Sequence, residues 1–104
     1  MTVAVVYAIF ADVDEAMRIG RTVVEERLAA CINITAPCTS IYWWEGKVEQ
    51  SDEAPAILKT TTDRVAPLIE RVAELHSYET PAIVGWPATH ALPAYAEWVK
   101  SELR

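Results

Sequence analysis

Residues 38–61 read CTSIYWWEGKVEQSDEAPAILKTT, and this stretch decides the fold. Two extended runs flank Glu45-Gly46, a pair typical of a tight turn between strands. The first run begins near residue 30, and Pro37 within it predicts a bulge or a sheet edge, because proline cannot donate to a ladder. Strands this long predict a hairpin that projects beyond the body of the domain. An isolated hairpin is marginally stable, so we expect it to lean on another chain.

The segments on either side of the hairpin alternate between strand and helix patterns. The nearly continuous apolar run TVAVVYAIF is typical of a strand at the centre of a sheet. Apolar residues then recur at helical spacing. The expected elements are a strand at 2–10, a helix at 12–28 capped by Asp12 or Asp14, the hairpin, a helix at 62–75 capped by Thr62-Asp63, a strand at 82–86 and a helix at 93–103.

This order is βαββαβ with a terminal helix. It predicts an α+β, ferredoxin-like sandwich, in which two helices cover one face of an antiparallel sheet. The 104 residues are enough for one core, so we expect a single domain over residues 1–104.

The charge balance restricts the partners. Fifteen acidic residues against nine basic ones give a formal charge of −6. A net anion is repelled by phosphates, so nucleic acids and anionic membranes are not expected as partners. The sequence contains no run of 18 apolar residues, so no membrane span is predicted. The first residues lack the basic region of a secretory signal, and we expect a cytoplasmic protein.

Two cysteines do not make a disulfide framework. If the segment is extended, Cys31 and Cys38 lie roughly 23 Å apart, whereas a disulfide requires Cα atoms within about 7 Å. Both are predicted to be reduced thiols. For Cys31 two roles remain open: a soft ligand suited to Cu(I), or a small buried apolar residue.

Motifs that carry known chemistry are missing from the chain. The sequence holds no phosphate-binding glycine loop, no nucleophile elbow and no H-E-x-x-H. We therefore expect binding and not catalysis. His76 is the candidate metal ligand, since imidazole is the commonest one. The alternative is that His76 completes the last turn of the second helix electrostatically.

Tyr42, Trp43 and Trp44 stand in tandem where the hairpin is expected to project. Strand alternation puts Tyr42 and Trp44 on one face and Trp43 on the other. A monomer would leave these rings in water, so the three residues are predicted to form an interface between subunits.

Lys59 lies in the apolar run at residues 56–62. A lysine in such a strand requires a carboxylate partner or an outward face. Glu45 and Glu79 are the candidate partners, and an ordinary ion pair at a strand end is the alternative.

Three blocks carry a family resemblance: the long blocks ERLAACINI at 26–34 and SIYWWEGKVE at 40–49, and the short block LKTT at 58–61. The segments HSYETPAI at 76–83 and YAEWV at 95–99 agree with it. Over essentially its whole length the chain resembles the CutA family of divalent-cation tolerance proteins. The resemblance implies a homotrimer in which long hairpins extend the sheets of neighbouring subunits, similar in fold and assembly to PII-type signal proteins.

The resemblance also implies a function, which is tolerance to divalent cations, with copper binding assigned to some bacterial members. The ligand positions of those members match Ala8, Leu75 and His76 here, so only His76 keeps a ligand side chain. Ala82 stands where the family usually has a glutamate. A copper or other divalent-cation site would therefore use His76 with Glu79 or a thiol.

A second hypothesis is a PII-like signal or scaffold trimer. Its clefts between subunits would bind a small anionic ligand or a partner protein, with Lys59 supplying the positive charge. The residues expected to line such a cleft are Tyr42, Trp44, Lys59, Tyr78 and Glu79.

Overall fold

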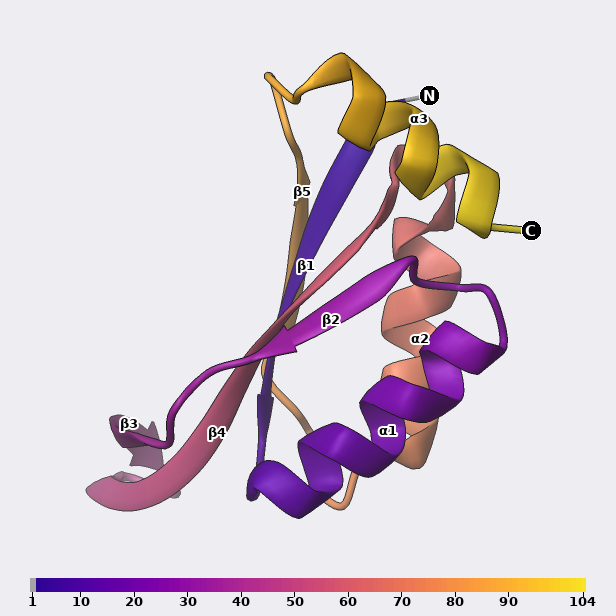
Figure 1. Ribbon diagram of the computed structural model, residues 1–104. Helices are drawn as coiled ribbons and strands as arrows, with labels where there is room; N and C mark the ends of the chain where they lie inside the picture. The colour runs from indigo at the N-terminus through magenta and orange to yellow at the C-terminus, as the bar shows by residue number, and fades with distance from the viewer. Residues whose placement is uncertain (1) are drawn as a thin grey trace.

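An antiparallel sheet of five strands organises residues 2–104 of the chain, which are the residues described by a computed structural model (Figure 1). The strand order is β2-β4-β1-β5, and β3 pairs with the far end of β4. This is the predicted ferredoxin-like order. The elements are β1 (Val3–Phe10), α1 (Val13–Glu25), β2 (Cys31–Ile34), β3 (Cys38–Trp44), β4 (Lys47–Thr61), a 3-10 turn (Thr62–Arg64), α2 (Val65–Leu75), β5 (Ile83–Pro87) and α3 (Pro93–Glu102).

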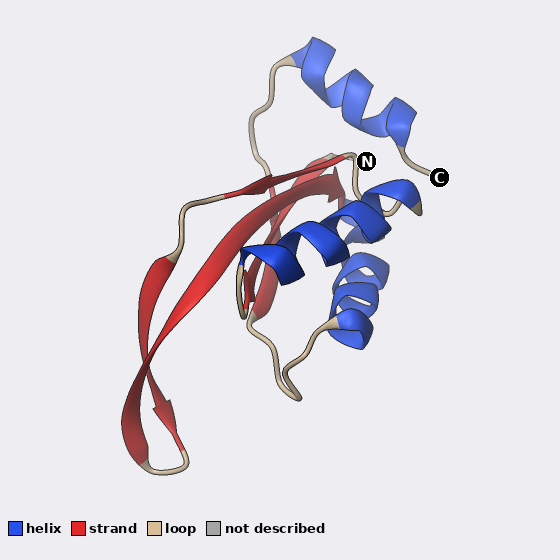
Figure 2. Cartoon of the chain, turned by 60° about the horizontal axis from the view of Figure 1, so that its bottom comes forward, coloured by secondary structure: helices blue, strands red, loops and turns tan. Residues whose placement is uncertain are grey.

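The main core lies between the sheet and the helices α1 and α2, which both cover one face (Figure 2). Alternate residues of β1 and β4, such as Phe10 and Leu58, point into it and are fully buried. Gly20 lets α1 approach β2 closely, because a Cβ there would lie 2.7 Å from Ile32 Cδ1.

The opposite face of the sheet is only partly covered. The helix α3 packs over one end of it, in a small cluster with Val3, Ala30 and Val99. β1 is central, as predicted, but Val5, Tyr7 and Ile9 on this side are only partly buried. We call the uncovered remainder the open sheet face; by strand alternation and register it comprises Val5, Tyr7, Ile57, Lys59, Val84 and Trp86.

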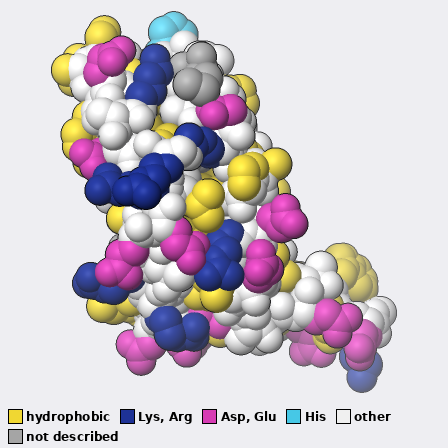
Figure 3. All heavy atoms as spheres, turned by 90° about the vertical axis from the view of Figure 1, so that its right-hand side faces the viewer, with side chains coloured by type: hydrophobic (Ala, Val, Ile, Leu, Met, Phe, Trp, Pro, Cys, Tyr) yellow, Lys and Arg dark blue, Asp and Glu magenta, His cyan; other side chains and the backbone are white. Residues whose placement is uncertain are grey.

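The hairpin β3–β4 projects well beyond the helices, as predicted (Figures 1 and 2). Pairing of β4 with β1 ends at Ala54, so residues 47–53 pair with β3 alone in the described part of the chain. Glu45 and Gly46 have φ values of 49° and 79°, which a type I′ hairpin turn requires. Acidic side chains gather at the projecting end (Figure 3).

The helix ends differ slightly from expectation. Asp12 caps α1 by accepting a hydrogen bond from the Glu15 amide at 2.8 Å. The helix ends at Glu25, earlier than predicted, because Arg27 adopts a left-handed φ of 64° and the Leu28 amide donates back to the Val23 carbonyl. The predicted cap Thr62-Asp63 instead begins the 3-10 turn, and no side chain caps α2.

Candidate functional site

His76 lies directly after α2, with its side chain completely buried. Its Nδ1 accepts a hydrogen bond from the Tyr78 amide at 3.0 Å, so the ring proton resides on Nε2. Nε2 then donates to the Ile9 carbonyl at 2.8 Å. The ring also stacks on Phe10, with centroids 5.3 Å apart. Both nitrogens of the neutral imidazole are therefore used to fasten the loop after α2 to the end of β1.

Glu15 is the second buried polar group of this network. Its carboxylate accepts from the Ala11 and Ser77 amides, each at 3.0 Å, and lies 3.6 Å from His76 Nε2. Burial alone raises the pKa of Glu15, but the hydrogen bonds from Ser77 and Ala11 outweigh it and hold the pKa below its usual value of 4.5. Glu15 thus fastens the same loop to the first turn of α1.

Tyr78 extends the network to the base of the hairpin. Its hydroxyl donates to Glu53 Oε2 at 2.8 Å, and Glu53 is buried. Burial and this hydrogen bond to a carboxylate raise the pKa of Tyr78, and Tyr42 nearby adds to the effect. The Tyr42 hydroxyl itself lies 3.1 Å from Ser51 Oγ. Of the predicted cleft residues, Tyr78 therefore contacts Glu53 at the base of the hairpin, whereas Tyr42 contacts Ser51 further along it.

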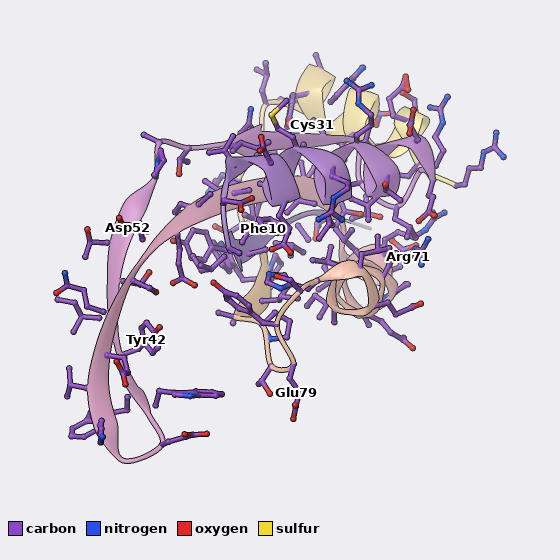
Figure 4. All side chains as sticks on the ribbon, turned by 90° about the horizontal axis from the view of Figure 1, so that it is seen from below. Phe10, Cys31, Tyr42, Asp52, Arg71 and Glu79 are labelled. Carbon is purple, nitrogen blue, oxygen red and sulfur yellow. The ribbon has the colours of Figure 1, made fainter. Side chains whose placement is uncertain are left out.

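The other predicted cleft residues lie elsewhere in the single chain. Trp44 is at the end of the hairpin, and Glu79 is exposed on the loop after α2, well apart from Tyr42 (Figure 4). Lys59 lies in the middle of the sheet, where its Nζ donates to Asn33 Oδ1 at 2.7 Å. Within residues 2–104 the prediction of Glu45 or Glu79 as its partner is wrong, because Lys59 instead reaches the amide of Asn33, which lies diagonal to it on β2, where the register puts Cys31 directly opposite.

Metal ligands do not gather in one place. Among residues 2–104 no group of three or more His, Cys, Asp or Glu side chains is placed to hold a metal ion. Ala8, which matches a family ligand position, is fully buried in the core. A metal would reach a nitrogen of His76 only after the hydrogen bond to Tyr78 or Ile9 breaks.

Both cysteines are free thiols, as predicted. The Cys31 sulfur lies 3.5 Å from the Tyr95 hydroxyl, beneath α3. Burial together with this contact raises the pKa of Tyr95 to about 12. Cys38 lies 3.7 Å from Ser40 Oγ, beside the break between β2 and β3.

Sequence reasoning missed Glu15 and Glu53. Glu15 lies in the first turn of the predicted first helix and Glu53 in the predicted hairpin, and neither position by itself indicates burial. Alternation along β4 puts Glu53 on the same face as Lys59. However, the loop that covers Glu53 comes from residues 25 positions later, and no local pattern indicates that contact.

These features define a class of protein: a ferredoxin-like α+β domain with an overlong hairpin, an open sheet face and a C-terminal helix. The family model described as the CutA1 divalent ion tolerance protein matches residues 4–102. The chain belongs to this CutA family.

Relatives cover the chain almost completely. The divalent-cation tolerance protein CutA of Pyrococcus horikoshii is 39% identical over 100 residues, which are 96% of this chain and 97% of that protein. The crystal structure of CutA from Xylella fastidiosa matches with a TM-score of 0.96 at 32% identity, over 100% of both chains. The structure of a periplasmic divalent cation tolerance protein CutA from Archaeoglobus fulgidus matches with a TM-score of 0.94 at 34% identity, over 98% and 99% of the two chains.

The lowered pKa of Glu15 predicts a specific dependence of stability on pH. A carboxyl group with a depressed folded-state pKa stabilises the fold above its unfolded-state value, near 4.5, and this contribution disappears as the pH falls through the folded-state pKa. Glu15→Gln should cost about 2 kcal/mol at pH 7, because two amides lose a charged acceptor. The cost should shrink progressively below pH 4.5.

Urea unfolding at a series of pH values between neutrality and strong acid measures this difference. Glu25→Gln is the matched control, since Glu25 is exposed on the same helix. If the difference in free energy of unfolding between wild type and Glu15→Gln stayed constant as the pH fell, that result would contradict the role given to Glu15.

Proposed function

We propose that this chain works as a homotrimeric divalent-cation tolerance protein that acts by binding and not by catalysis. The observation that carries the assembly is the uncovered apolar surface of the open sheet face and the hairpin. Val84, Trp86 and Trp44 are each about half exposed in the single chain. Monomeric proteins rarely leave apolar area of this extent in water, and aromatic residues of this kind are enriched at interfaces.

The hairpin and the open sheet face form one continuous surface. β4 runs without a bulge from Lys47 to Thr61, so strand alternation puts Tyr42 and Trp44 on the same side as Lys59. A neighbouring subunit laid along this side would support the projecting hairpin and cover the apolar sheet together. Contacts between two different patches close into a ring when the rotation allows, and the family resemblance implies a ring of three.

Trp44→Ala should weaken the trimer, because truncating a buried interface aromatic often costs about 2 kcal/mol or more. Sedimentation at micromolar concentration should give the wild type three times the subunit mass of 11.6 kDa, and a lower average mass for the variant. Met17→Ala is the control, since Met17 is an equally exposed apolar residue on α1. A wild type at subunit mass, or a variant indistinguishable from it, would refute the proposed assembly.

A copper or other divalent-cation site at His76 belongs to this proposal. The buried Glu15 carboxylate supports it, because it lies 3.6 Å from Nε2 and offers an oxygen ligand. Glu79 and a thiol are the further candidates. Because the ring nitrogens are already hydrogen-bonded, metal binding must be coupled to a shift of the loop that carries Tyr78.

Titration of the reduced protein with Cu(I) without oxygen, and then with Cu(II) and Zn(II), should show saturable binding that His76→Ala abolishes. His90→Ala is the control, because His90 is exposed on a loop far along the chain from α2. The far-ultraviolet circular dichroism of His76→Ala must match wild type for the comparison to count. Binding that survives in a folded His76→Ala protein would exclude this residue as a ligand.

Lys59 favours the second candidate function, a cleft between subunits for a small anionic ligand. In residues 2–104 its ammonium has no carboxylate within 4.0 Å and contacts the Asn33 amide oxygen alone. Covering this ammonium with a neighbouring subunit is costly unless an anion accompanies it. The anion is either a carboxylate of the neighbour or a bound ligand.

Calorimetric titration with phosphate, citrate and a nucleoside triphosphate distinguishes these two sources. If a ligand supplies the charge, one of these anions should bind, and Lys59→Ala should lose that binding while the trimer mass stays the same. Lys47→Ala, on the exposed hairpin, should bind as wild type does. No binding of any of the three anions to wild type would count against the ligand and for a carboxylate of the neighbour.

The cytoplasm remains the proposed compartment. Two free thiols suit a reducing environment. No helix within the described residues is long and apolar enough to cross a membrane. The Archaeoglobus fulgidus relative, by contrast, is named as a periplasmic protein, so compartments within the family differ.

A further inference from the structure

A second apolar surface lies on the other side of the hairpin. Trp43 is 75% exposed, Ile41 69% and Val48 58%, which makes them among the most exposed large apolar side chains. Trp43 and Val48 are direct partners across the β3–β4 ladder, and Ile41 follows on the same face. We call these three residues the Trp43 patch.

The Trp43 patch faces away from the surface assigned to the trimer. Alternation puts it on the helix side of the sheet, but α1 and α2 end well before the hairpin (Figure 2). In the described part of the chain, therefore, no other element covers it. A neighbour lying on the Tyr42 and Trp44 side would leave the patch bare on the outside of the assembly. Neither the core nor the proposed trimer accounts for it.

The charges around the patch select the kind of partner. Acidic side chains gather at this end of the molecule (Figure 3). Glu45 lies in the turn beside the patch, while the exposed Glu49 and the one exposed base of the hairpin, Lys47, lie on the Tyr42 face. Asp52 lies on the same face as Val48 by alternation. The whole chain has a charge of −6, and three copies carry three times as much. Two such assemblies repel each other, whereas a basic segment is attracted.

We infer that the Trp43 patch is a docking surface for a basic, apolar segment of another protein. An aliphatic or aromatic side chain of the segment packs against the Trp43 indole between Ile41 and Val48. Lysine or arginine side chains flanking this anchor pair with Glu45 and Asp52, and one of them can lie over the indole face, which attracts cations. This function is additional to the proposed trimer, because it uses the opposite face of the hairpin.

Selection from a library of random displayed peptides tests both where the docking surface lies and which kind of peptide it binds. Wild-type protein is the bait, and binders to Trp43→Ala are removed by counter-selection. The enriched peptides should combine lysine or arginine with an aliphatic or aromatic anchor. Synthesised, they should bind Trp43→Ala at least about tenfold more weakly than wild type, and binding should weaken as salt is raised. Trp98→Ala, which removes a half-exposed tryptophan of α3, should bind as wild type does.

Two outcomes of this selection overturn the inference. One is the absence of any enrichment that depends on Trp43. The other is enrichment of acidic or uncharged peptides, which would contradict the charge argument.

Sedimentation of Trp43→Ala separates this inference from the proposed trimer. The variant should keep the wild-type mass. If it dissociates, or if wild type forms a larger assembly that Trp43→Ala abolishes, the patch is a contact between copies and the docking inference fails while self-association stands. Conversely, a monomeric wild type that still binds basic peptides through Trp43 would refute the trimer and leave the docking surface intact.

Discussion

The antiparallel pairing of β4 with β1 is the constraint on which the rest of this structure depends. All of Val3–Phe10 pairs with the second half of β4, which makes these two strands the centre of the sheet. β4 then continues past the end of β1, so its first half has only β3 beside it in the described chain. One uninterrupted strand therefore forms part of both the core and the projecting hairpin. Because side chains alternate along it without a break, each face of the hairpin continues one face of the sheet.

The buried polar network lies where β4 leaves the core. Glu15, His76, Tyr78 and Glu53 come from three segments, α1, the loop after α2 and β4, and hydrogen bonds satisfy all four side chains. In the described residues no fully buried side-chain nitrogen or oxygen lacks a partner. Such a network stabilises one arrangement of the loop after α2, and it makes His76 a ligand only at the expense of existing bonds. A response to cations through His76 would thus also be a movement of that loop.

The two faces of the hairpin differ in what surrounds them. The face with Tyr42 and Trp44 continues into the open sheet face, where Lys59 is the one charged residue. This largely apolar surface suits contact with a second copy of the chain. The face with Trp43 has no such continuation, and acidic residues border it. Because the net negative charge adds up over the copies of an assembly, repulsion between two assemblies disfavours self-association through the Trp43 face.

The sequence by itself determined the order of elements, the hairpin turn at Glu45-Gly46 and the separation of Trp43 from its neighbouring rings. These follow from local spacing, turn chemistry and strand alternation, which a single sequence records. The tertiary structure alone decided that His76 is hydrogen-bonded at both nitrogens, that Glu15 and Glu53 are buried, and that Lys59 contacts Asn33 and not a carboxylate. Each of these contacts joins segments far apart in the chain, and the partners are selected by how the layers pack and not by any neighbouring residue.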